Sequence, residues 1–503
     1  LSFVLTHWWL KLFSPQEEVN SLWIARSLNA ILGAVSIPAI FGLGTLAFRS
    51  RLVGQISAAL MAVSPYGIYL AQEARHYTLC ILWIIASLGC LVVAIRAIVH
   101  QAPLPIWMVC VWVIVNSLGI ATHYFFAVAL GAEGLVIGRF WLKDFWHKKN
   151  QLKDEKKGEI LLPSYWWRIY AVALGTLIGC LVWLPVLWGV PNNELTNWIE
   201  TSFKFSELWQ PIPRLLAWCI TMVFLLPVEG TNLVVTVISA IVLLLVLLWV
   251  LPAVIQGIRL QMASPSSRLS LWIVGGFLLG VIAIILLIIY GYGRDLSKAA
   301  RYQFIYFPAL IALLGSALAI CWQKEEKTPT EKSKSFYFSV PKAKGKKVVI
   351  VVLLMGLCGA FTVVSNYGFQ RSQRADLLAP RIQAISDVPV LIAMTYETYA
   401  ELRALITLAF EFKRLDRLNI NSSSPAVTVH SPQFILVQKQ KDEIDITLST
   451  LKKNISSLSR PVDLWGVNLK IDSQDIEALG CPRDSQSQPD INGYRYRLYH
   501  CRA

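Results

Sequence analysis

The stretch Ala71-Gln72-Glu73-Ala74-Arg75-His76-Tyr77 places a carboxylate, a guanidinium and an imidazole between two long apolar runs. The run before it covers residues 53 to 70, and the run after it covers about 77 to 96. As a helix, each run is long enough to cross roughly 30 Å of hydrocarbon. A Glu and an Arg at the edge of a hydrocarbon layer must pair, reach the interface or line a polar cavity. The stretch therefore predicts a membrane-spanning fold and marks a candidate site.

The composition of the whole chain is typical of a polytopic membrane protein. Its 503 residues are 55% hydrophobic and only 15% charged, with a mean hydropathy of +0.54. A single water-soluble core does not account for these values. Backbone polar groups cannot stay unpaired in lipid, so the spanning segments are predicted to be helices. The expected fold class is a mostly α, transmembrane helix bundle.

The formal net charge of +15 lies mostly in two Lys-rich loops, Arg139–Arg168 and Gln323–Lys347. Loops of this kind are typical of the cytoplasmic side of a membrane protein. Topology therefore explains the charge, and no nucleic-acid partner is expected. The second loop is also expected to be flexible.

About ten complete spans are expected between residues 1 and 366. They are residues 22–48, 53–70, 77–96, the two halves of 105–142, 166–190, 231–256, 269–290, 301–322 and 347–366. The 105–142 run is too long for one crossing and is split at Thr122-His123-Tyr124, which we take as its only polar interruption. Residues 1–13 are expected to form an interfacial helix, and residues 215–226 a half-buried or surface helix.

The tail, residues 367–503, is polar enough to form a separate soluble α/β domain. Strands are expected at Val388–Met394 and Gln433–Gln438, and helices at Tyr399–Leu415 and Asp442–Leu451. With the basic loops inside, the parity of the spans places this domain outside the cytoplasm.

Two of the nine Cys, Cys481 and Cys501, lie in this tail, whereas the other seven lie in apolar runs. In an oxidising compartment these two thiols could pair, and the sequence leaves open whether they do.

Three polar clusters are predicted on the outer face of the membrane. They are Glu73, Arg75, His76 and Tyr77; His123 and Tyr124; and Arg294, Asp295, Lys298, Arg301 and Tyr302. Arg binds phosphate through two parallel charge-assisted hydrogen bonds. Cations, a carboxylate and aromatic walls with access from lipid therefore favour an anionic, lipid-linked substrate.

Each of these residues also has a simpler interpretation. Arg75 and Arg301 could reach lipid headgroups, and Glu73 could be the salt-bridge partner of either. His123 could be a hydrogen-bonded packing residue, and tyrosines at this level could belong to an interfacial aromatic belt.

The order of several short motifs resembles bacterial glycosyltransferase family 39, which has the GT-C fold and includes relatives of protein O-mannosyltransferases and of the aminoarabinose transferase of lipid A. The motifs are Leu10-Lys11-Leu12-Phe13, Ala25-Arg26-Ser27-Leu28-Asn29-Ala30, Ser64-Pro65-Tyr66, Gln72-Glu73-Ala74-Arg75-His76-Tyr77, Thr122-His123-Tyr124-Phe125 and Ala300-Arg301-Tyr302. The resemblance covers roughly residues 1 to 320.

The resemblance implies an inverting transfer of sugar from a polyprenyl-phosphate donor to a glycan, lipid or protein acceptor outside the plasma (inner) membrane. Such transferases use an acidic residue of the first outer loop, often with a divalent cation such as Mg²⁺ or Mn²⁺. Basic residues neutralise the departing lipid phosphate.

On this chain, the resemblance implies phosphate contact by Arg75 and Arg301. Glu73 would hold that pair or contact the acceptor or a metal, and His123 and Tyr124 would line the cavity. By analogy, the tail domain would cover the cavity mouth and influence acceptor choice.

The first span and acidic loop of the family have no counterpart in these residues, so the general base is expected upstream of Leu1 and no catalytic residue is assigned. A transporter or flippase for an anionic lipid-linked substrate is one alternative. A catalytically inactive fragment or scaffold is another, and the segment upstream of Leu1 would distinguish it from an enzyme.

Overall fold

The computed structural model describes residues 1–13, 21–154, 164–185, 199–200, 207–228, 232–323, 345–367, 373–396, 399–421, 432–438, 449, 451–455, 460–486 and 488–502. The chain divides into two compact units, Leu1–Phe369 and Gln370–Ala503. Composition alone places the domain boundary after residue 366.

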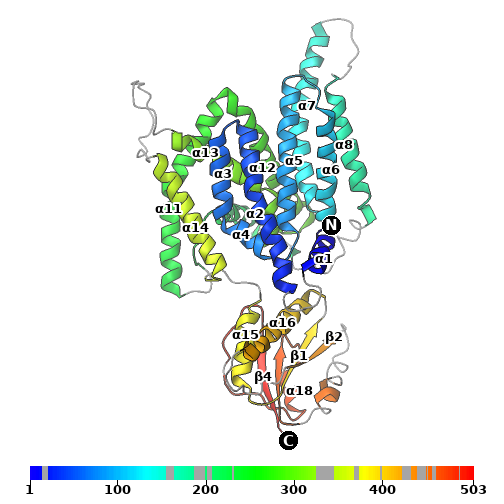
Figure 1. The fold of residues 1–503 in the computed structure, drawn as a ribbon, viewed down its shortest axis with the longest axis vertical. Coiled ribbons are helices and arrows are strands. Elements are labelled where there is room, and N and C mark those ends of the chain that lie inside the picture. Colours follow the sequence, from blue (N-terminus) through cyan, green and yellow to red (C-terminus); the bar gives the residue numbers. More distant parts are fainter. Residues whose placement is uncertain are drawn as a thin grey trace. The chain divides into compact units, whose positions relative to one another are not determined.

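The first unit is helical (Figure 1). Its elements are α1 (Ser2–Phe13), α2 (Ser21–Phe48), α3 (Arg51–Val63), α4 (Pro65–Gln72), α5 (Tyr77–Val99), α6 (Ile106–Thr122), α7 (Phe126–Asp154), α8 (Trp166–Leu181), α10 (Pro211–Thr221), α11 (Leu233–Ala263), α12 (Pro265–Tyr292), η3 (Leu296–Lys298), η4 (Ala300–Ile305), α13 (Phe307–Gln323) and α14 (Gly345–Val364).

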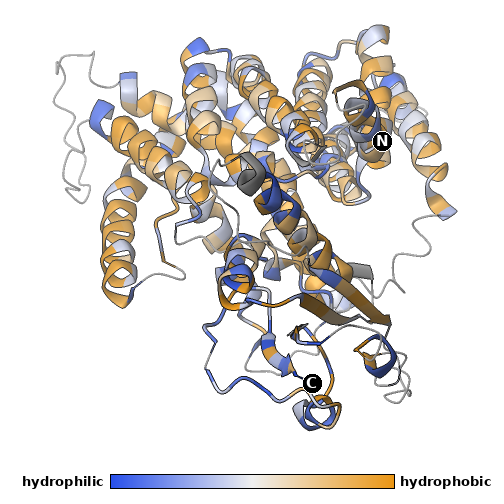
Figure 2. Ribbon diagram, turned by 60° about the horizontal axis from the view of Figure 1, so that its bottom comes forward, coloured by the Kyte–Doolittle hydropathy of each residue, from blue (hydrophilic) through white to orange (hydrophobic). Residues whose placement is uncertain are grey.

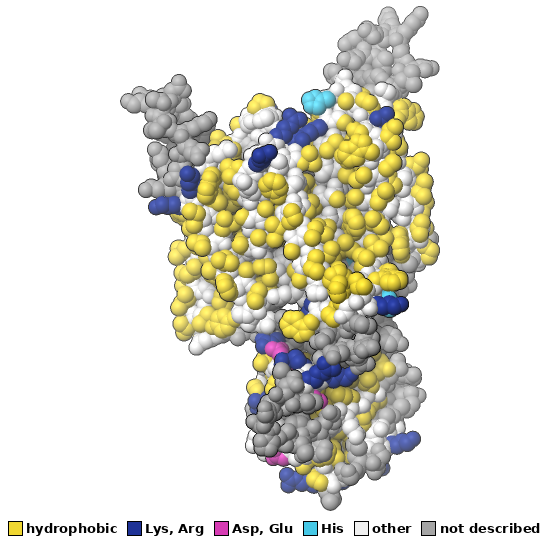
Figure 3. Space-filling model, in the orientation of Figure 1, with side chains coloured by type: hydrophobic (Ala, Val, Ile, Leu, Met, Phe, Trp, Pro, Cys, Tyr) yellow, Lys and Arg dark blue, Asp and Glu magenta, His cyan; other side chains and the backbone are white. Residues whose placement is uncertain are grey.

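Several of these helices are built to cross a membrane. Within the described residues, five are long and apolar enough by themselves, namely α2, α5, α11, α12 and α14, and the bent pair α3–α4 could form a sixth. The shorter helices α6, α8 and α13 are also apolar. Its helices consist mostly of hydrophobic residues (Figure 2). On the face that Figure 3 shows, hydrophobic side chains cover most of the surface, and several Lys and Arg lie along its upper edge. The multi-pass fold is confirmed, and the figure of ten spans stays a prediction.

The run expected to form one straight span at 53–70 is instead the pair α3–α4, bent by 55°. The bend lies at Ser64-Pro65, because proline disfavours the helical conformation of the residue before it. Ser64 has extended backbone angles and caps α4 by accepting the Gly67 N–H. Its hydroxyl also donates to the Met222 carbonyl oxygen at 2.7 Å, which fixes the bend against the segment after α10.

The span expected at 301–322 also begins later than predicted, because residues 300–305 form the 3₁₀ helix η4 and α13 starts only at Phe307. Upstream, α12 ends at Gly293, whose φ of 66° is a left-handed conformation that glycine adopts without steric cost. Residues 294–306 are therefore an irregular segment between two long helices. This matters because the segment carries Arg301 and Tyr302.

The split of the 105–142 run into α6 and α7 is confirmed. The assumption that Thr122-His123-Tyr124 is its only polar interruption is wrong, however. Asn116 and Glu133 lie within these two helices, and both side chains are buried. Part of the expected basic loop is also helical, because α7 continues to Asp154.

Where α2 and α5 end and α12 begins, arginine side chains donate hydrogen bonds to backbone carbonyl oxygens. Arg96 donates to the Leu46 and Ala47 oxygens at 2.8 and 2.7 Å, and Arg268 donates to the Met262 oxygen at 2.8 Å. These carbonyls are left over at helix ends, where cations satisfy them and favour the dipole. Most of the Lys-rich 323–347 loop lies outside the described residues.

Two short helices lie apart from the long ones. The expected interfacial helix is α1, which has no buried residue and is joined to α2 by a Trp9–Ser27 hydrogen bond of 3.1 Å. The helix expected near 215–226 is α10, whose 11 residues are too few to cross a bilayer.

The second unit is a four-stranded sheet with helices on both faces. Its elements are α15 (Ala375–Ile385), β1 (Val390–Tyr396), α16 (Tyr399–Asn421), β2 (Gln433–Gln438), β3 (Val462–Val467), α18 (Ser473–Glu477) and β4 (Tyr496–Cys501). The strand order is β2-β1-β3-β4, parallel except for the last pair.

Alternation along β1 divides its side chains between two cores. Ile392 and Met394 face α15 and α16, whereas Leu391 and Ala393 face the helical residues after 450 and α18. The predicted α/β tail is thus confirmed. The helix expected at Asp442–Leu451 lies largely outside the described residues.

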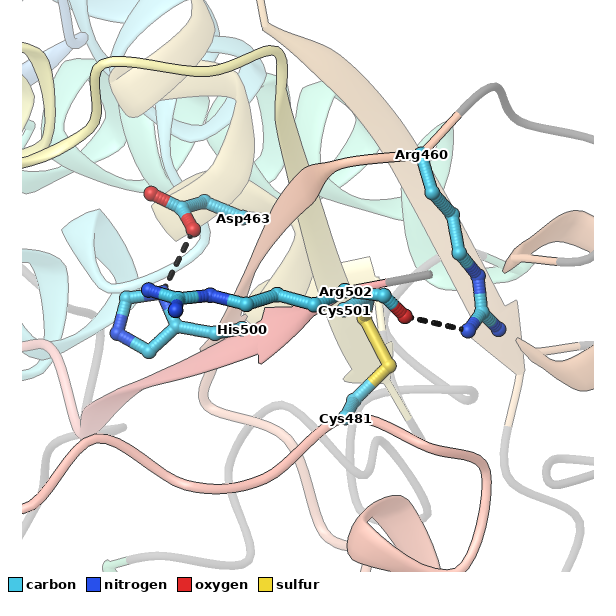
Figure 4. The surroundings of a disulfide bond; sticks show 6 residues. All are labelled: Arg460, Asp463, Cys481, His500, Cys501 and Arg502. Carbon is cyan, nitrogen blue, oxygen red and sulfur yellow. Dashed lines mark hydrogen bonds and ion pairs between the residues drawn. A yellow bond between two sulfur atoms is a disulfide. The ribbon is translucent and has the colours of Figure 1, made fainter.

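Cys481 and Cys501 form a disulfide that ties the end of β4 to the segment after α18 (Figure 4). Beside it, His500 on β4 bonds to Asp463 on β3, with 2.8 Å between His Nδ1 and Asp Oδ1. The question that the sequence left open is answered in favour of pairing.

Removing this disulfide should loosen the tail. The bond closes a loop with a sequence separation of 20 residues, for which chain-entropy arguments give about 3 kcal/mol. Replacing Cys501 by Ser should therefore lower the free energy of unfolding of the tail. A protease added to the full chain in lipid should then cleave the tail faster than it does in the wild type. The control is Cys358→Ser, an exposed thiol on α14. Equal proteolysis of the Cys501 variant and the wild type would contradict this prediction.

Candidate functional site

Three segments far apart in the sequence meet at one end of the helix bundle. They are the α4–α5 connection, which leads into Tyr77, the α6–α7 connection and the irregular 294–306 segment. Each is where a helix stops, so polar side chains and free backbone groups are concentrated there. The convergence of clusters expected from the sequence is therefore present in the fold.

Two histidines lie at the centre of this meeting point. The ring centroids of His76 and His123 are 4.3 Å apart. The Nδ1 of His123 accepts the Phe125 N–H at 3.0 Å, so the proton of the neutral ring is on Nε2. The Nε2 of His76 is buried and has no hydrogen-bond partner among the described residues.

Both histidines are held in the neutral form. Burial, reinforced by the nearby Arg75 charge, lowers the pKa of His76 to about 4. Burial and the neighbouring His76 lower the pKa of His123 to about 3. Neither ring supplies a positive charge at neutral pH, so any cationic character of the site comes from arginine and lysine.

Aromatic rings form a wall around the histidines. The ring centroid of Phe304 is 5.6 Å from the centroid of Tyr77 and 5.6 Å from that of His123. The ring centroids of Tyr302 and Phe125 are 4.9 Å apart. These contacts join the start of α5, the α6–α7 connection and η4. Burial raises the pKa of Tyr124 to about 12, so its hydroxyl stays protonated and able to donate.

The carboxylate of Glu73 is partly neutralised within its own segment. Its Oε1 accepts the Tyr69 hydroxyl at 3.1 Å, and its Oε2 lies 3.5 Å from Arg75 Nε. Burial disfavours the charged form of Arg75, but Glu73, Tyr77 and Tyr69 together outweigh it, so the pKa of the guanidinium is raised. The salt-bridge interpretation of Glu73 thus describes this structure, and its partner is Arg75.

Arg301 and Arg75 interact electrostatically with the same three tyrosines. Both guanidiniums are within electrostatic range of Tyr69, Tyr77 and Tyr302. Arg301 also lies 5.9 Å from the centre of the Tyr302 ring. The group therefore brings two permanent cations to an aromatic wall, with the Glu73 carboxylate beside Arg75.

The remaining residues predicted for the site have different surroundings. Arg294 forms an ion pair with Glu200, with 3.4 Å between Nη2 and Oε1. Lys298 is exposed. A substrate-binding role for these two residues stays a prediction.

Asp295, between them, holds the segment in place. Its side chain is 0% exposed and accepts from Arg214 Nη1 at 2.8 Å, from Ser297 Oγ at 2.5 Å and from the Ser297 N–H at 3.1 Å. From α10, Trp218 Nε1 donates to the Ser297 oxygen at 2.8 Å. From α4, the Tyr66 hydroxyl donates to the Ala300 oxygen at 2.7 Å. These contacts fix the backbone on both sides of Lys298.

The described residues do not fit a divalent cation at Glu73. They contain no group of three or more His, Cys, Asp or Glu side chains able to hold a metal ion. The guanidinium of Arg75, 3.5 Å from the carboxylate, also repels a second positive charge. A requirement for Mg²⁺ or Mn²⁺ stays a prediction that these residues do not support.

Four residues of the site were not predicted from the sequence, namely Tyr69, Phe304, Arg214 and Trp218, and Phe125 was quoted in a motif without a role of its own. Tyr69 lies one helical turn before a quoted motif, and Phe304 lies two positions after one. Arg214 and Trp218 gave no signal, because their partners are about 80 residues away in the chain.

Acidification should destabilise this end of the bundle. The pKa values of His76 and His123 are lower in the folded protein than the ordinary value of about 6.5. The unfolded chain therefore binds more protons below that pH, and stability falls as pH drops from 6.5 toward 4. Thermal unfolding in lipid between pH 7.5 and 4 measures this. His123→Asn keeps an acceptor near the Phe125 N–H and should reduce the slope, and an unchanged slope would contradict the assignment.

Breaking the Asp295–Arg214 pair should release the irregular segment. Asp295→Ala leaves the Ser297 N–H without its acceptor and removes the carboxylate from the part-exposed Arg214, which still donates to Gln210. Hydrogen exchange of residues 294–306 should rise. The exposed Glu411–Arg414 pair of the tail provides a control, because Glu411→Ala should leave this segment unchanged. Equal protection of the segment in wild type and Asp295→Ala would refute this role.

Comparison with known proteins identifies the fold of the chain. No family model matches the chain, and no curated protein matches it. Among solved structures, it is similar to ArnT from Cupriavidus metallidurans bound to undecaprenyl phosphate, with a TM-score of 0.51 and 13% identity over 100% of this chain and 87% of that chain. The apo state of the same ArnT gives a TM-score of 0.50 and 12% identity over 99% and 87%. At such identity the likeness is one of fold, and it confirms that this chain has the GT-C fold.

Proposed function

We propose that the chain is a membrane glycosyltransferase that takes a sugar from a polyprenyl-phosphate donor and passes it to an acceptor outside the cytoplasm. The observation that carries this proposal is that Arg75 and Arg301 both lie within electrostatic range of Tyr69, Tyr77 and Tyr302, beside an aromatic wall. The fold is shared with ArnT, one structure of which has undecaprenyl phosphate bound.

The two guanidiniums suit the departing group of such a reaction. When the bond between the anomeric carbon and the phosphate oxygen breaks, the polyprenyl phosphate leaves with an additional negative charge. Arg75 and Arg301 would bind that phosphate and stabilise the charge as it develops. The leaving group needs cations more than it needs a proton, so neutral His76 and His123 are compatible with this step.

The aromatic wall would hold the sugar. Tyr77, Tyr302 and Phe304 offer flat apolar faces, while the Tyr124 hydroxyl and the Nε2–H of His123 can donate hydrogen bonds to sugar oxygens. Inversion at the anomeric carbon, the acceptor class and the base that activates the acceptor belong to the proposal as expectations.

We also propose that the site faces the outside of the inner membrane. Arg96, Arg168 and Arg268 are at the other end of the helices, as the positive-inside rule requires of a cytoplasmic face. The Cys481–Cys501 disulfide supports an extracytoplasmic tail, because such bonds persist in oxidising compartments.

Replacing Arg301 by Ala should lower the rate of sugar transfer by about 10² to 10³-fold, as expected for loss of one group that stabilises the transition-state charge. The assay is the release of polyprenyl phosphate from a labelled polyprenyl-phosphate sugar by the full-length protein in lipid. Arg301→Lys should recover only part of the activity, because it lacks the bidentate fork.

The matched control is Arg268→Ala, which removes an exposed arginine at the other end of the bundle. It should transfer at the wild-type rate. Wild-type transfer by Arg301→Ala would refute the assignment of Arg301. Binding of polyprenyl phosphate without any transfer by the wild type would favour the transporter or flippase instead.

A further inference from the structure

A carboxyl group lies inside the helix bundle, away from the candidate site. Glu133 is on α7, two turns after the helix begins at Phe126, and its side chain is 3% exposed. The helix places it next to α5 and α6, which run beside α7 (Figure 1). Nothing in the proposed transfer reaction uses this residue.

Glu133 belongs to a buried polar network that joins four helices. Its Oε1 is 2.5 Å from Ser87 Oγ on α5. Two side chains of α6 are hydrogen-bonded to the same Ser87 Oγ. Asn116 Oδ1 is 2.8 Å from it, and Trp112 Nε1 is 3.1 Å from it. The Asn116 amide continues to Thr176 Oγ1 on α8 at 3.2 Å.

The surroundings of Glu133 contain no compensating positive charge. Among the described residues, no Arg, Lys or His forms an ion pair with it. The other titratable group near it is the Cys90 thiol on α5. From α12, Gly280 and Ile284 face the adjoining residues of α7, and α6 and α8 contribute only the neutral groups named above. An ionised carboxylate in such a place is costly.

Hydrogen-bond accounting leads to the same conclusion. Ser87 has one proton and two oxygen neighbours that accept, the Asn116 oxygen and Glu133. It also receives the Trp112 N–H. If the Ser87 proton goes to Asn116, the short contact to Glu133 needs a proton from the carboxyl group. If the Asn116 side chain is rotated so that its amide nitrogen faces Ser87, the Ser87 proton can go to Glu133 instead. Glu133 would then be an ionised carboxylate without a cation beside it among the described residues.

We propose that Glu133 holds a proton in the folded protein and, as a neutral carboxylic acid, donates the hydrogen bond that ties α7 to Ser87 of α5 and through it to α6. The bundle thus contains a proton-binding site in addition to its candidate sugar-transfer site.

The position of this proton gives it an effect on the site. α5 begins at Tyr77, α6 ends at Thr122 and α7 begins at Phe126, so the three helices that meet at Glu133 carry the His76–His123 contact at their ends. Loss of the proton would place a bare charge between these helices and weaken their packing. The proposal does not depend on the transfer reaction, because it concerns the bundle itself.

Infrared spectroscopy of the full chain in lipid tests the protonation directly. At neutral pH, the carbonyl stretch of a protonated carboxylic acid should appear in the wild type, move on exchange into heavy water and disappear in Glu133→Gln. The matched control is Asp144→Asn on the same helix, which removes a carboxylate that accepts bonds from Tyr165 and Trp166. It should leave the band intact. Absence of the band in the wild type, or its survival in Glu133→Gln, would overturn the proposal.

Thermal unfolding provides a second readout. Glutamine has nearly the shape of the neutral acid and can donate to Ser87, so Glu133→Gln should unfold near the wild-type midpoint at pH 7 and lose less stability than wild type as pH rises. Glu133→Ala removes the donor and should unfold at a lower temperature. A midpoint for Glu133→Gln as low as that of Glu133→Ala would contradict the proposal. If the Ala variant does not fold, the infrared comparison still decides.

Discussion

Polar groups that this chain carries into its apolar bundle are stabilised by partners within the chain, because lipid offers none, and the buried Nε2 of His76 is an exception among the described residues. The bend at Ser64 is held by a bond to the Met222 carbonyl, and the end of α2 is held by Arg96. The irregular segment before α13 is held by the buried Asp295, which Arg214 neutralises. Irregular backbone is present where such partners meet, and the candidate site occupies one of these places. The requirement to satisfy buried polar groups therefore organises both the fold and the site.

The chemistry available at the site follows from which of its groups remain charged. Burial keeps His76 and His123 neutral, whereas Arg75 and Arg301 keep their charge under all ordinary conditions. Glu73 offsets the charge of Arg75. The result is a pair of arginines beside an aromatic wall, an arrangement that suits the phosphate and the sugar ring of the proposed donor.

The sequence predicted the helix bundle, the α/β tail and the meeting of the three polar clusters, because apolar runs and charge patterns record which segments cross a membrane and which face they reach. It did not predict the bend at Ser64-Pro65 or the 3₁₀ turns before Phe307, since these depend on Met222, Tyr66 and Arg214 from distant parts of the chain. Glu133 was overlooked for a related reason. One carboxyl hardly changes the average hydropathy of a long apolar run, although its burial dominates the local energetics.

The start of α5 within the aromatic cluster has an electrostatic consequence for the site. His76 precedes the helix, whose first N–H groups have no partner within it. The aligned peptide dipoles of α5 therefore direct a partial positive charge, roughly half an elementary charge, toward the rings. This field opposes protonation of His76 and adds to the attraction that the guanidiniums exert on an anion. The backbone of a membrane-crossing helix thus contributes to the affinity of the site, and no side-chain substitution can remove that contribution.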